Sequence, residues 1–214
     1  MQWKSLFLAL IISLCATHSF AQEFSYQFNQ SISAQTKMTE NQHYALLAGG
    51  CFWCIEAAFD GVDGVQMAIS GYTGGVESHP SYKQVASGYT GHKEAVWIVY
   101  DPTVISYGKI LEIFWKNIDP TQADGQFADI GAHYQTAIFA LNQSQYDEAI
   151  ASREALSKKK MFRKPIVTEI IMGQTFWPAE ESHQNYHLEN KAHYQSYKEG
   201  SGRAGFIRKV WGKH

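Results

Sequence analysis

The chain has 214 residues, of which 45% are hydrophobic and 14% aromatic, and its 18 basic and 20 acidic residues give a formal net charge of −2. This near-neutral balance gives no electrostatic reason to expect binding to nucleic acid or to a membrane surface. The length and the many aromatic side chains are sufficient for one domain with a packed core.

Residues 1–21 have the pattern of a secretory signal peptide, with Lys4 ahead of an apolar run over residues 5–16. Ser19-Phe20-Ala21 matches the small-x-small pattern that signal peptidase cuts, so we expect cleavage after this triplet. The apolar run is much shorter than the roughly 20 residues of a membrane-spanning helix. Cys15 raises the alternative of a lipoprotein, although the leucine before it is a poor match for that processing. We therefore expect an exported protein, in a bacterial periplasm, without stable insertion in a membrane.

The mature chain is expected to begin with a flexible segment over residues 22–43, which are polar and rich in Gln, Ser and Asn. Residues 44–214 are then expected to form a single globular domain. Removal of the signal would take away Lys4, the only charged residue before position 22, and change the formal charge from −2 to −3. It would also leave Cys51 and Cys54 as the only cysteines.

From Tyr44 onwards the apolar pattern alternates between strand and helix periods. Gly49-Gly50 separates the first strand from the first helix, and Gly61 is a stop signal for that helix. The pattern up to position 100 predicts strands over Tyr44–Ala48, Val65–Tyr72 and Glu94–Tyr100, and helices over Cys51–Asp60 and Ser81–Ala86.

The second half of the chain continues the alternation. Residues 110–118 carry apolar side chains at helical spacing, and Asn142 is a suitable N-cap for a helix over Ser144–Lys160. Strands are predicted over Ala137–Leu141 and Ile166–Met172, and Pro178 is expected to begin the last clear helix. The whole pattern predicts an α/β (α+β) two-layer sandwich, in which helices pack on a mixed sheet with a ferredoxin-like core.

The predicted elements place Cys51 in the turn between a strand and the first turn of a helix. A helix N-terminus carries about half a positive charge and unpaired N–H groups, which favour the thiolate that acts as a nucleophile. Cys54 follows one turn later on the same face, within the spacing that a disulfide allows.

Three interpretations of the pair follow from this spacing. The cysteines could be inert core residues, or they could supply half of the ligands of a zinc site, although no second pair is present. They could also form a redox pair, which suits an exported protein that needs a cycling thiol. The spacing by itself is only moderately specific.

The segment Gly50-Cys51-Phe52-Trp53-Cys54 resembles the active-site signature of the peptide methionine sulfoxide reductase A family. The resemblance covers about Tyr44 to Trp211, and a chain of matched segments of this kind is highly specific. Further segments match in the family's order: Gly71–Gly75, Pro80–Tyr82, Gly91–Glu94, Tyr100–Pro102, Asp119–Gln122, Asp129–Gly131 and Phe176–Glu180.

The resemblance implies thiol-dependent reduction of the S epimer of methionine sulfoxide, free or within proteins, to methionine. It makes Cys51 the nucleophile and Glu94 the acid that protonates the sulfoxide oxygen. Apolar neighbours of Glu94 on the predicted strand would keep its carboxyl neutral.

The resemblance also assigns the residues that would hold the substrate. Phe52 and Trp53 would form a dry aromatic pocket for the methyl group. Tyr82 and Tyr134 would hydrogen-bond the sulfoxide oxygen, and Asp129 would bind the substrate backbone or order the site.

The expected cycle oxidises Cys51 to a sulfenic acid, which Cys54 then resolves to a Cys51–Cys54 disulfide. Many relatives carry a resolving cysteine in the C-terminal tail, but the tail Tyr197–His214 has none, which leaves Cys54 as the only internal resolver. Turnover would need a thioredoxin-type dithiol reductant and no bound cofactor. We expect a monomer that repairs oxidised exported proteins.

Each site residue has a structural alternative. Glu94 could be a solvated residue at the start of a strand, and Tyr82 and Tyr134 could be packing residues like most tyrosines. His183 and His187 stand four positions apart, as metal ligands on a helix can, but the segment lacks the glutamate and third ligand of a zinc protease. We therefore predict no metal there.

Two other classes of protein share some of these features. An exported disulfide oxidoreductase of thioredoxin type would also carry two cysteines three positions apart, although Phe52 and Trp53 would crowd a protein disulfide. A non-catalytic, metal-loaded binding module is the other alternative. Reduction of insulin would identify the first class, and the metal content of the purified protein would identify the second.

Overall fold

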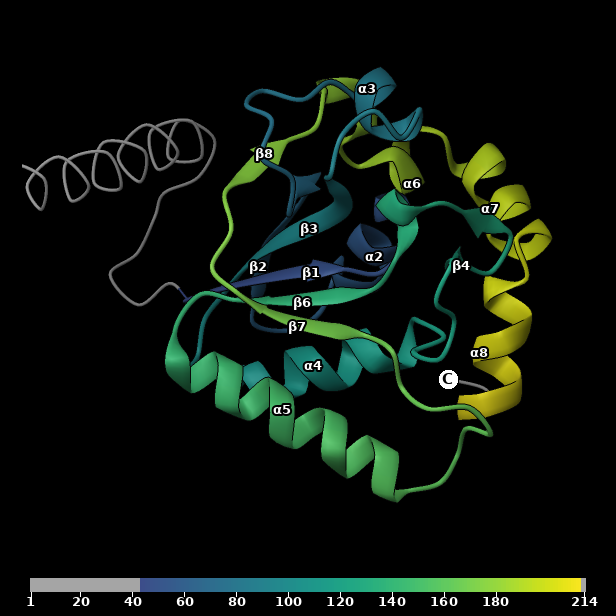
Figure 1. The fold of residues 1–214 in the computed structure, drawn as a ribbon. Coiled ribbons are helices and arrows are strands. Elements are labelled where there is room, and N and C mark those ends of the chain that lie inside the picture. The colour runs from purple at the N-terminus through teal and green to yellow at the C-terminus, as the bar shows by residue number, and fades with distance from the viewer. Residues whose placement is uncertain (1–42, 213–214) are drawn as a thin grey trace, which may run out of the picture. The chain divides into compact units, whose positions relative to one another are not determined.

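The computed structural model describes residues 43–212, so the expected signal peptide and most of the flexible segment lie outside the described residues. A six-stranded sheet forms the centre of this region (Figure 1). All its neighbouring strands are antiparallel except β6 and β7, which makes the sheet mixed. Its strands, in spatial order, are β7 (Glu169–Met172), β6 (Ala137–Ala140), β1 (His43–Ala48), β3 (Lys93–Tyr100), β2 (Val65–Thr73) and β8 (Phe176–Pro178).

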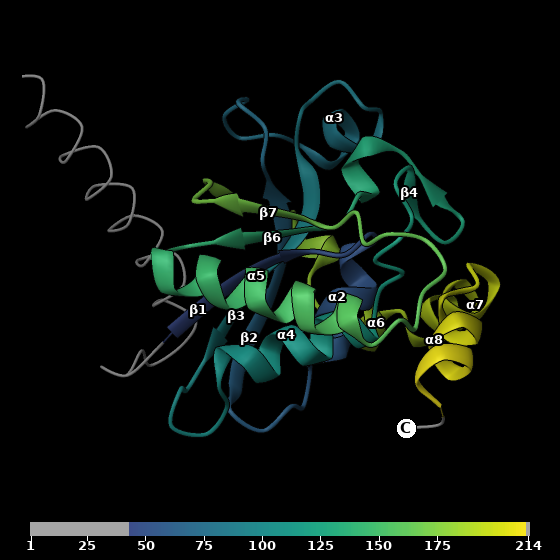
Figure 2. The ribbon, with the colours of Figure 1, turned by 60° about the horizontal axis from the view of Figure 1, so that its bottom comes forward.

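Three helices pack together on one face of this sheet: α2 (Phe52–Phe59), α4 (Tyr107–Lys116) and α5 (Gln143–Lys158) (Figure 2). The chain passes through β1, α2, β2, β3, α4 and β6, while the strands lie in the order β6-β1-β3-β2. This is the split βαβ arrangement of a ferredoxin-like core. The predicted fold class is therefore confirmed.

The remaining elements are short and lie mostly toward the C-terminus. They are α3 (Tyr82–Ala86), β4 (Gly125–Gln126), β5 (Asp129–Ile130), η1 (Ala132–Tyr134), η2 (Glu181–His183), α6 (Tyr186–Glu189), α7 (Lys191–Gly200) and α8 (Arg203–Trp211). Of these, β4 and β5 form a separate two-stranded sheet.

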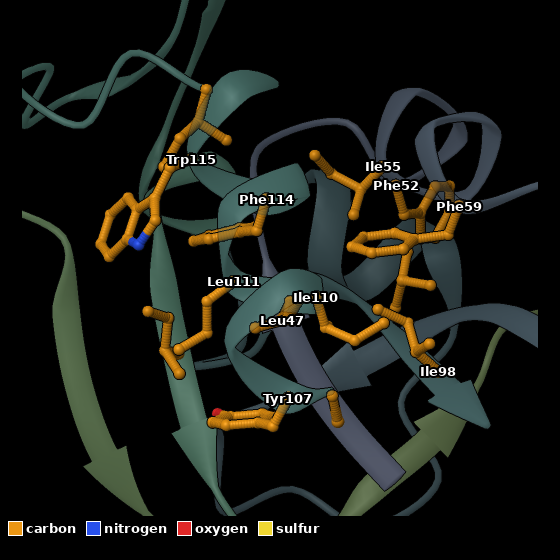
Figure 3. Close-up of a cluster of buried hydrophobic side chains, with 14 of the residues drawn as sticks. Leu47, Phe52, Ile55, Phe59, Ile98, Tyr107, Ile110, Leu111, Phe114 and Trp115 are labelled. Carbon is orange, nitrogen blue, oxygen red and sulfur yellow. The ribbon is translucent and has the colours of Figure 1, made fainter. Parts of the chain in front are cut away.

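The main hydrophobic core lies between the sheet and the helices α2 and α4 (Figure 3). Alternate residues of the strands point into it, and the apolar residues of α4 recur at helical spacing, so both elements bury one face. Each fully buried Leu, Ile or Phe contributes about 1.5–3 kcal/mol. This burial fixes α2, and therefore its first turn, against β2 and β3. The core includes Leu47, Phe52, Ile55, Phe59, Ile98, Tyr107, Ile110, Leu111, Phe114 and Trp115.

Most predicted elements are present within one to three residues of their predicted ends. Asn142 is the N-cap of α5, and its side-chain oxygen accepts a 2.9 Å hydrogen bond from the amide of Gln145. Within residues 43–212 no helix is both long enough and apolar enough to cross a membrane.

The prediction that Pro178 begins a helix is wrong. Pro178 is the last residue of β8, where it pairs with Gly71 of β2. A proline lacks the N–H that a central strand needs, but β8 is the outermost strand of the sheet and tolerates it. The helices of the C-terminal segment begin later, at Tyr186, Lys191 and Arg203.

Candidate active site

The two cysteines lie at the start of α2, in the turn that follows β1. Cys51 is the N-cap residue, and the amide of Cys54 donates a 3.1 Å hydrogen bond to the Cys51 carbonyl. Both thiols are free, and only 5% of Cys51 and 3% of Cys54 is exposed. The pair is therefore almost entirely desolvated, with a small accessible surface left on Cys51.

The glycine pair before Cys51 allows the turn to pack tightly. A Cβ atom on Gly49 would lie 2.5 Å from the side chain of Ile55. Gly50 has φ +82, and a Cβ atom there would lie 2.5 Å from Gln126 and 2.8 Å from the guanidinium of Arg203. A side chain at Gly49 would require Ile55 to move, and one at Gly50 would also be strained by the positive φ, so the glycines let the polypeptide approach β4 and α8 directly before the nucleophile.

The structure corrects the expected ionisation of the pair. Burial raises the pKa of Cys51, and its hydrogen bond with Cys54 and the neighbouring Glu94 carboxyl raise it further. A hydrogen bond with Tyr197 lowers this pKa but is the smallest of these effects. The pKa of Cys54 is lowered by the hydrogen bond from Cys51 and then by the positive charge of Arg203. The partial charge of the helix N-terminus does not overcome desolvation at Cys51, and of the two thiols Cys54 is the one whose pKa is lowered, to about 6.

Glu94 lies at the start of β3 and faces the first turn of α2. The amide of Phe52 donates a 2.9 Å hydrogen bond to Oε2 of Glu94, whose side chain is buried with 1% of the residue exposed. Burial raises the pKa of Glu94 to about 8, and the charges of Asp129 and Cys54 act in the same direction. The carboxyl is therefore mostly protonated at neutral pH, which a proton donor requires and a solvated strand residue would not show.

Tyr82 and Tyr134 approach the same carboxyl from α3 and η1. Burial raises the pKa of both phenols, and for each the next cause is the charge of Glu94, with Cys51 also contributing. The structure thus brings both phenols close to Glu94 and Cys51. Glu180, which sequence reasoning did not assign to the site, fixes the start of α3 because its carboxylate accepts a 2.8 Å hydrogen bond from the Tyr82 amide.

Asp129 lies in β5 and accepts a short hydrogen bond from the hydroxyl of Tyr197. The same hydroxyl interacts with the thiol of Cys51. Tyr197, on α7, therefore links the nucleophile to Asp129, a role that the sequence analysis missed. The available signal was that Tyr194 and Tyr197 are three positions apart and so share one helix face.

The aromatic side chains of the signature lie in a larger aromatic cluster. Phe52 is buried and stacks on Tyr82 with ring centroids 6.3 Å apart. Trp53 is half-buried and stacks on Tyr186 at 3.8 Å. His183 lies among these rings, 4.2 Å from Tyr82 and 5.9 Å from Trp53. Such a surface can hold a methyl group out of water.

The two histidines considered as metal ligands have separate environments. His183 belongs to the aromatic cluster, whereas Nε2 of His187 lies 3.1 Å from a carboxylate oxygen of Asp60. Among residues 43–212 no group of three or more His, Cys, Asp or Glu side chains is arranged to hold a metal ion.

Comparison with known sequences gives one consistent result. The sequence model of the family described as "Peptide methionine sulfoxide reductase" matches residues 43–214. The peptide methionine sulfoxide reductase MsrA of Bacillus subtilis is 49% identical over 175 residues, which cover 82% of this chain and 99% of that protein. The corresponding protein of Listeria monocytogenes serotype 4b is 49% identical over 172 residues, or 80% of this chain and 97% of that protein.

Two solved structures share the fold of this chain. The reduced form of Mxr1 from Saccharomyces cerevisiae aligns with a TM-score of 0.67 and 29% identity, covering 72% of this chain and 88% of that chain. Methionine sulfoxide reductase A of Corynebacterium diphtheriae aligns with a TM-score of 0.64 and 26% identity, covering 73% of this chain and 78% of that chain.

Proposed function

This chain belongs to the peptide methionine sulfoxide reductase family, and we propose that its Cys51–Cys54 pair reduces the S epimer of methionine sulfoxide, free or within proteins, to methionine. Membership makes it an oxidoreductase of methionine sulfoxide; the stereochemistry and the steps below are our proposal. One observation supports this proposal more strongly than the others. The Glu94 carboxyl is buried, mostly protonated at neutral pH and held by the amide next to Cys51, which is the placement that a proton donor to the sulfoxide oxygen needs.

The first half-reaction begins when the sulfoxide enters the aromatic cluster with its methyl group against Phe52 and Trp53. The proton of Cys51 passes to Cys54, and the Cys51 thiolate attacks the sulfoxide sulfur. Glu94 gives its proton to the oxygen, which Tyr82 and Tyr134 hydrogen-bond. The hydroxyl group then moves to the Cys51 sulfur while the S–S and S–O bonds to the substrate sulfur break, so that methionine leaves and Cys51 is oxidised to a sulfenic acid.

The second half-reaction restores the thiols. Cys54 gives its proton to the Glu94 carboxylate, and its thiolate attacks the sulfenic sulfur of Cys51. The S–O bond breaks, an S–S bond forms, and the hydroxide leaves as water with that proton. A thioredoxin-type dithiol then reduces the disulfide and is itself oxidised. No cofactor takes part. Cys54 is proposed as the resolving thiol because the tail from Tyr197 onward contains no cysteine.

We also propose that the enzyme works as a monomer in the bacterial periplasm and repairs oxidised exported proteins there. The support for export is the signal-like pattern of residues 1–21. Mass spectrometry of the protein recovered from a periplasmic fraction tests it, because cleavage after Ala21 predicts glutamine as the first residue. An intact N-terminus in the cytoplasmic fraction would contradict it.

The direct test of the function is incubation with both methionine sulfoxide epimers and dithiothreitol, followed by chiral analysis. We expect loss of the S epimer alone, and no loss with Cys51→Ser. Reduction of insulin without consumption of sulfoxide would instead identify a disulfide oxidoreductase.

A further inference from the structure

Arg203 is the largest fully buried side chain of the described region, with 1% of the residue exposed. It is the first residue of α8, in the tail that carries no cysteine. Its Nη1 donates a 2.5 Å hydrogen bond to the carbonyl of Asn117, and its Nη2 donates a 3.0 Å bond to the carbonyl of Gly49. The guanidinium also lies 4.7 Å from the ring centroid of Phe127. An arginine of α8 is thus buried against the turn that leads into Cys51.

The contacts of Arg203 leave its charge uncompensated by any carboxylate. The ion pairs found within residues 43–212 do not include it, and both its hydrogen-bond acceptors are neutral carbonyls. A buried guanidinium without a counter-charge is costly, because desolvation is not repaid by Coulomb attraction. The burial of Arg203 therefore points to an anion nearby that is not Asp or Glu.

The Cys51–Cys54 turn supplies such an anion. Nη2 of Arg203 would lie only 2.8 Å from a Cβ atom on Gly50, so the cation contacts the backbone directly before the pair. Five further groups interact with Cys54: Cys51 at the start of its own helix, Glu94 on β3, Lys198 and Tyr194 on α7, and Asp129 on β5. Lys198 is half-buried, and Asp129 opposes ionisation of Cys54, which makes Arg203 the principal fixed positive charge.

We propose that Arg203 is a positioning residue whose guanidinium is the counter-ion of the Cys54 thiolate, so that the cysteine-free tail supports the resolving step by charge instead of by a thiol. The inference rests on the proposed function, because it concerns the step in which Cys54 attacks the Cys51 sulfenic acid. The hydrogen bonds that the Arg203 guanidinium makes within the described residues go to the backbone carbonyls of Asn117 and Gly49. Arg203 acts by keeping Cys54 ionised, and therefore nucleophilic, at neutral pH.

The test measures Cys54 without any substrate. In a Cys51→Ser background, the rate of alkylation by iodoacetamide is followed against pH, with modification read at Cys54 by mass spectrometry. Arg203→Gln keeps hydrogen-bond donors for the two carbonyls but removes the charge. Arg203→Lys keeps the charge, and Arg208→Gln is the matched control, because Arg208 is an exposed residue of the same helix that pairs with Glu199 at 3.0 Å.

We expect Arg203→Gln to move the alkylation profile toward higher pH by about 1 pH unit, which is about tenfold slower alkylation on the acidic side of the profile. Arg203→Lys should stay near the parent profile, and Arg208→Gln should not move it. A folded Arg203→Gln protein with the parent profile would overturn the proposal. If that variant does not fold, Arg203→Lys decides: an unchanged profile supports the counter-ion role, and a profile displaced by about 1 pH unit overturns it.

A second measurement connects the charge of Arg203 to the resolving step of the catalytic cycle. With Cys51 intact, Arg203→Gln should form the disulfide about tenfold more slowly than the parent at pH values below the Cys54 pKa of about 6. Because the alkylation assay uses no sulfoxide, it can succeed in a protein that reduces none, so failure of the proposed function and failure of this inference give different results.

Discussion

The Phe52 amide donates a 2.9 Å hydrogen bond to Oε2 of Glu94, so the residue that follows the nucleophile also fixes the proton donor. This single bond joins the first turn of α2 to the start of β3. One carboxyl oxygen is occupied by the amide, and the other is left to carry the proton. The helix that presents Cys51 therefore also sets where the sulfoxide oxygen must lie.

Replacing Glu94 by glutamine should slow methionine release at least about 100-fold at neutral pH, because the amide cannot give up a proton while the Phe52 contact is retained. Rapid-quench measurement of a single turnover checks this. Glu154→Gln, on the exposed face of α5, is the control and should match the parent. A Glu94→Gln enzyme as fast as the parent would remove Glu94 from the mechanism.

The same variant offers a check that does not depend on activity. The pKa of Glu94 is about 8 in the folded protein and roughly 4.3 when unfolded, so between these values the folded state binds more protons and the parent loses stability as pH rises. Glutamine cannot ionise, so Glu94→Gln should gain stability relative to the parent across this range. Urea unfolding at pH values near these two pKa values measures the difference in free energy of unfolding between the variant and the parent. A difference that does not change with pH would show that Glu94 is not held neutral.

The pH dependence of the first half-reaction should report the same carboxyl. Because Glu94 must be protonated to act, the rate of methionine release in a single turnover should fall as pH rises through about 8. The measurement is a rapid-quench series across neutral and alkaline pH in the parent enzyme. A rate that keeps rising with pH well above this value would mean that thiol ionisation alone limits the step.

Cys54→Ser should still release about one methionine per enzyme, because Cys51 and Glu94 remain, but it should recycle poorly with thioredoxin. Thiol counting and steady-state assays on the same preparation check both parts. Cys51→Ser is the matched control and should release none. Full steady-state turnover by Cys54→Ser would require another resolving thiol.

Tyr197→Phe removes the hydroxyl that contacts both Asp129 and Cys51. Because this hydroxyl lowers the pKa of Cys51, its loss should raise that pKa further and slow methionine release about tenfold, the cost of one hydrogen bond to a charged group. Alkylation of Cys51 against pH, alongside single-turnover rates, measures both effects. Tyr146→Phe, on α5, is the control, and equal behaviour of the two variants would leave Tyr197 a packing residue.

The sequence by itself determined the elements that its local periodicity encodes. The strand before Cys51, the helix after it, the Asn142 cap and the layered α/β class all follow from residues close together in the chain. Pro178 shows the limit of this reasoning, because a proline suits both a helix start and an edge strand, and only the pairing with β2 decides between them.

Tertiary structure alone decided the charge state of the site. The local rule assigns the thiolate to Cys51 at the helix N-terminus, whereas burial and the neighbouring Glu94 raise the pKa of Cys51, and the hydrogen bond from Cys51 and the charge of Arg203 lower the pKa of Cys54. Arg203 lies 154 positions from Gly49, whose carbonyl it binds, and Tyr197 lies 68 positions from Asp129. Ionisation depends on desolvation and on charges a few ångströms away, and these are properties of the packed chain that no local pattern contains.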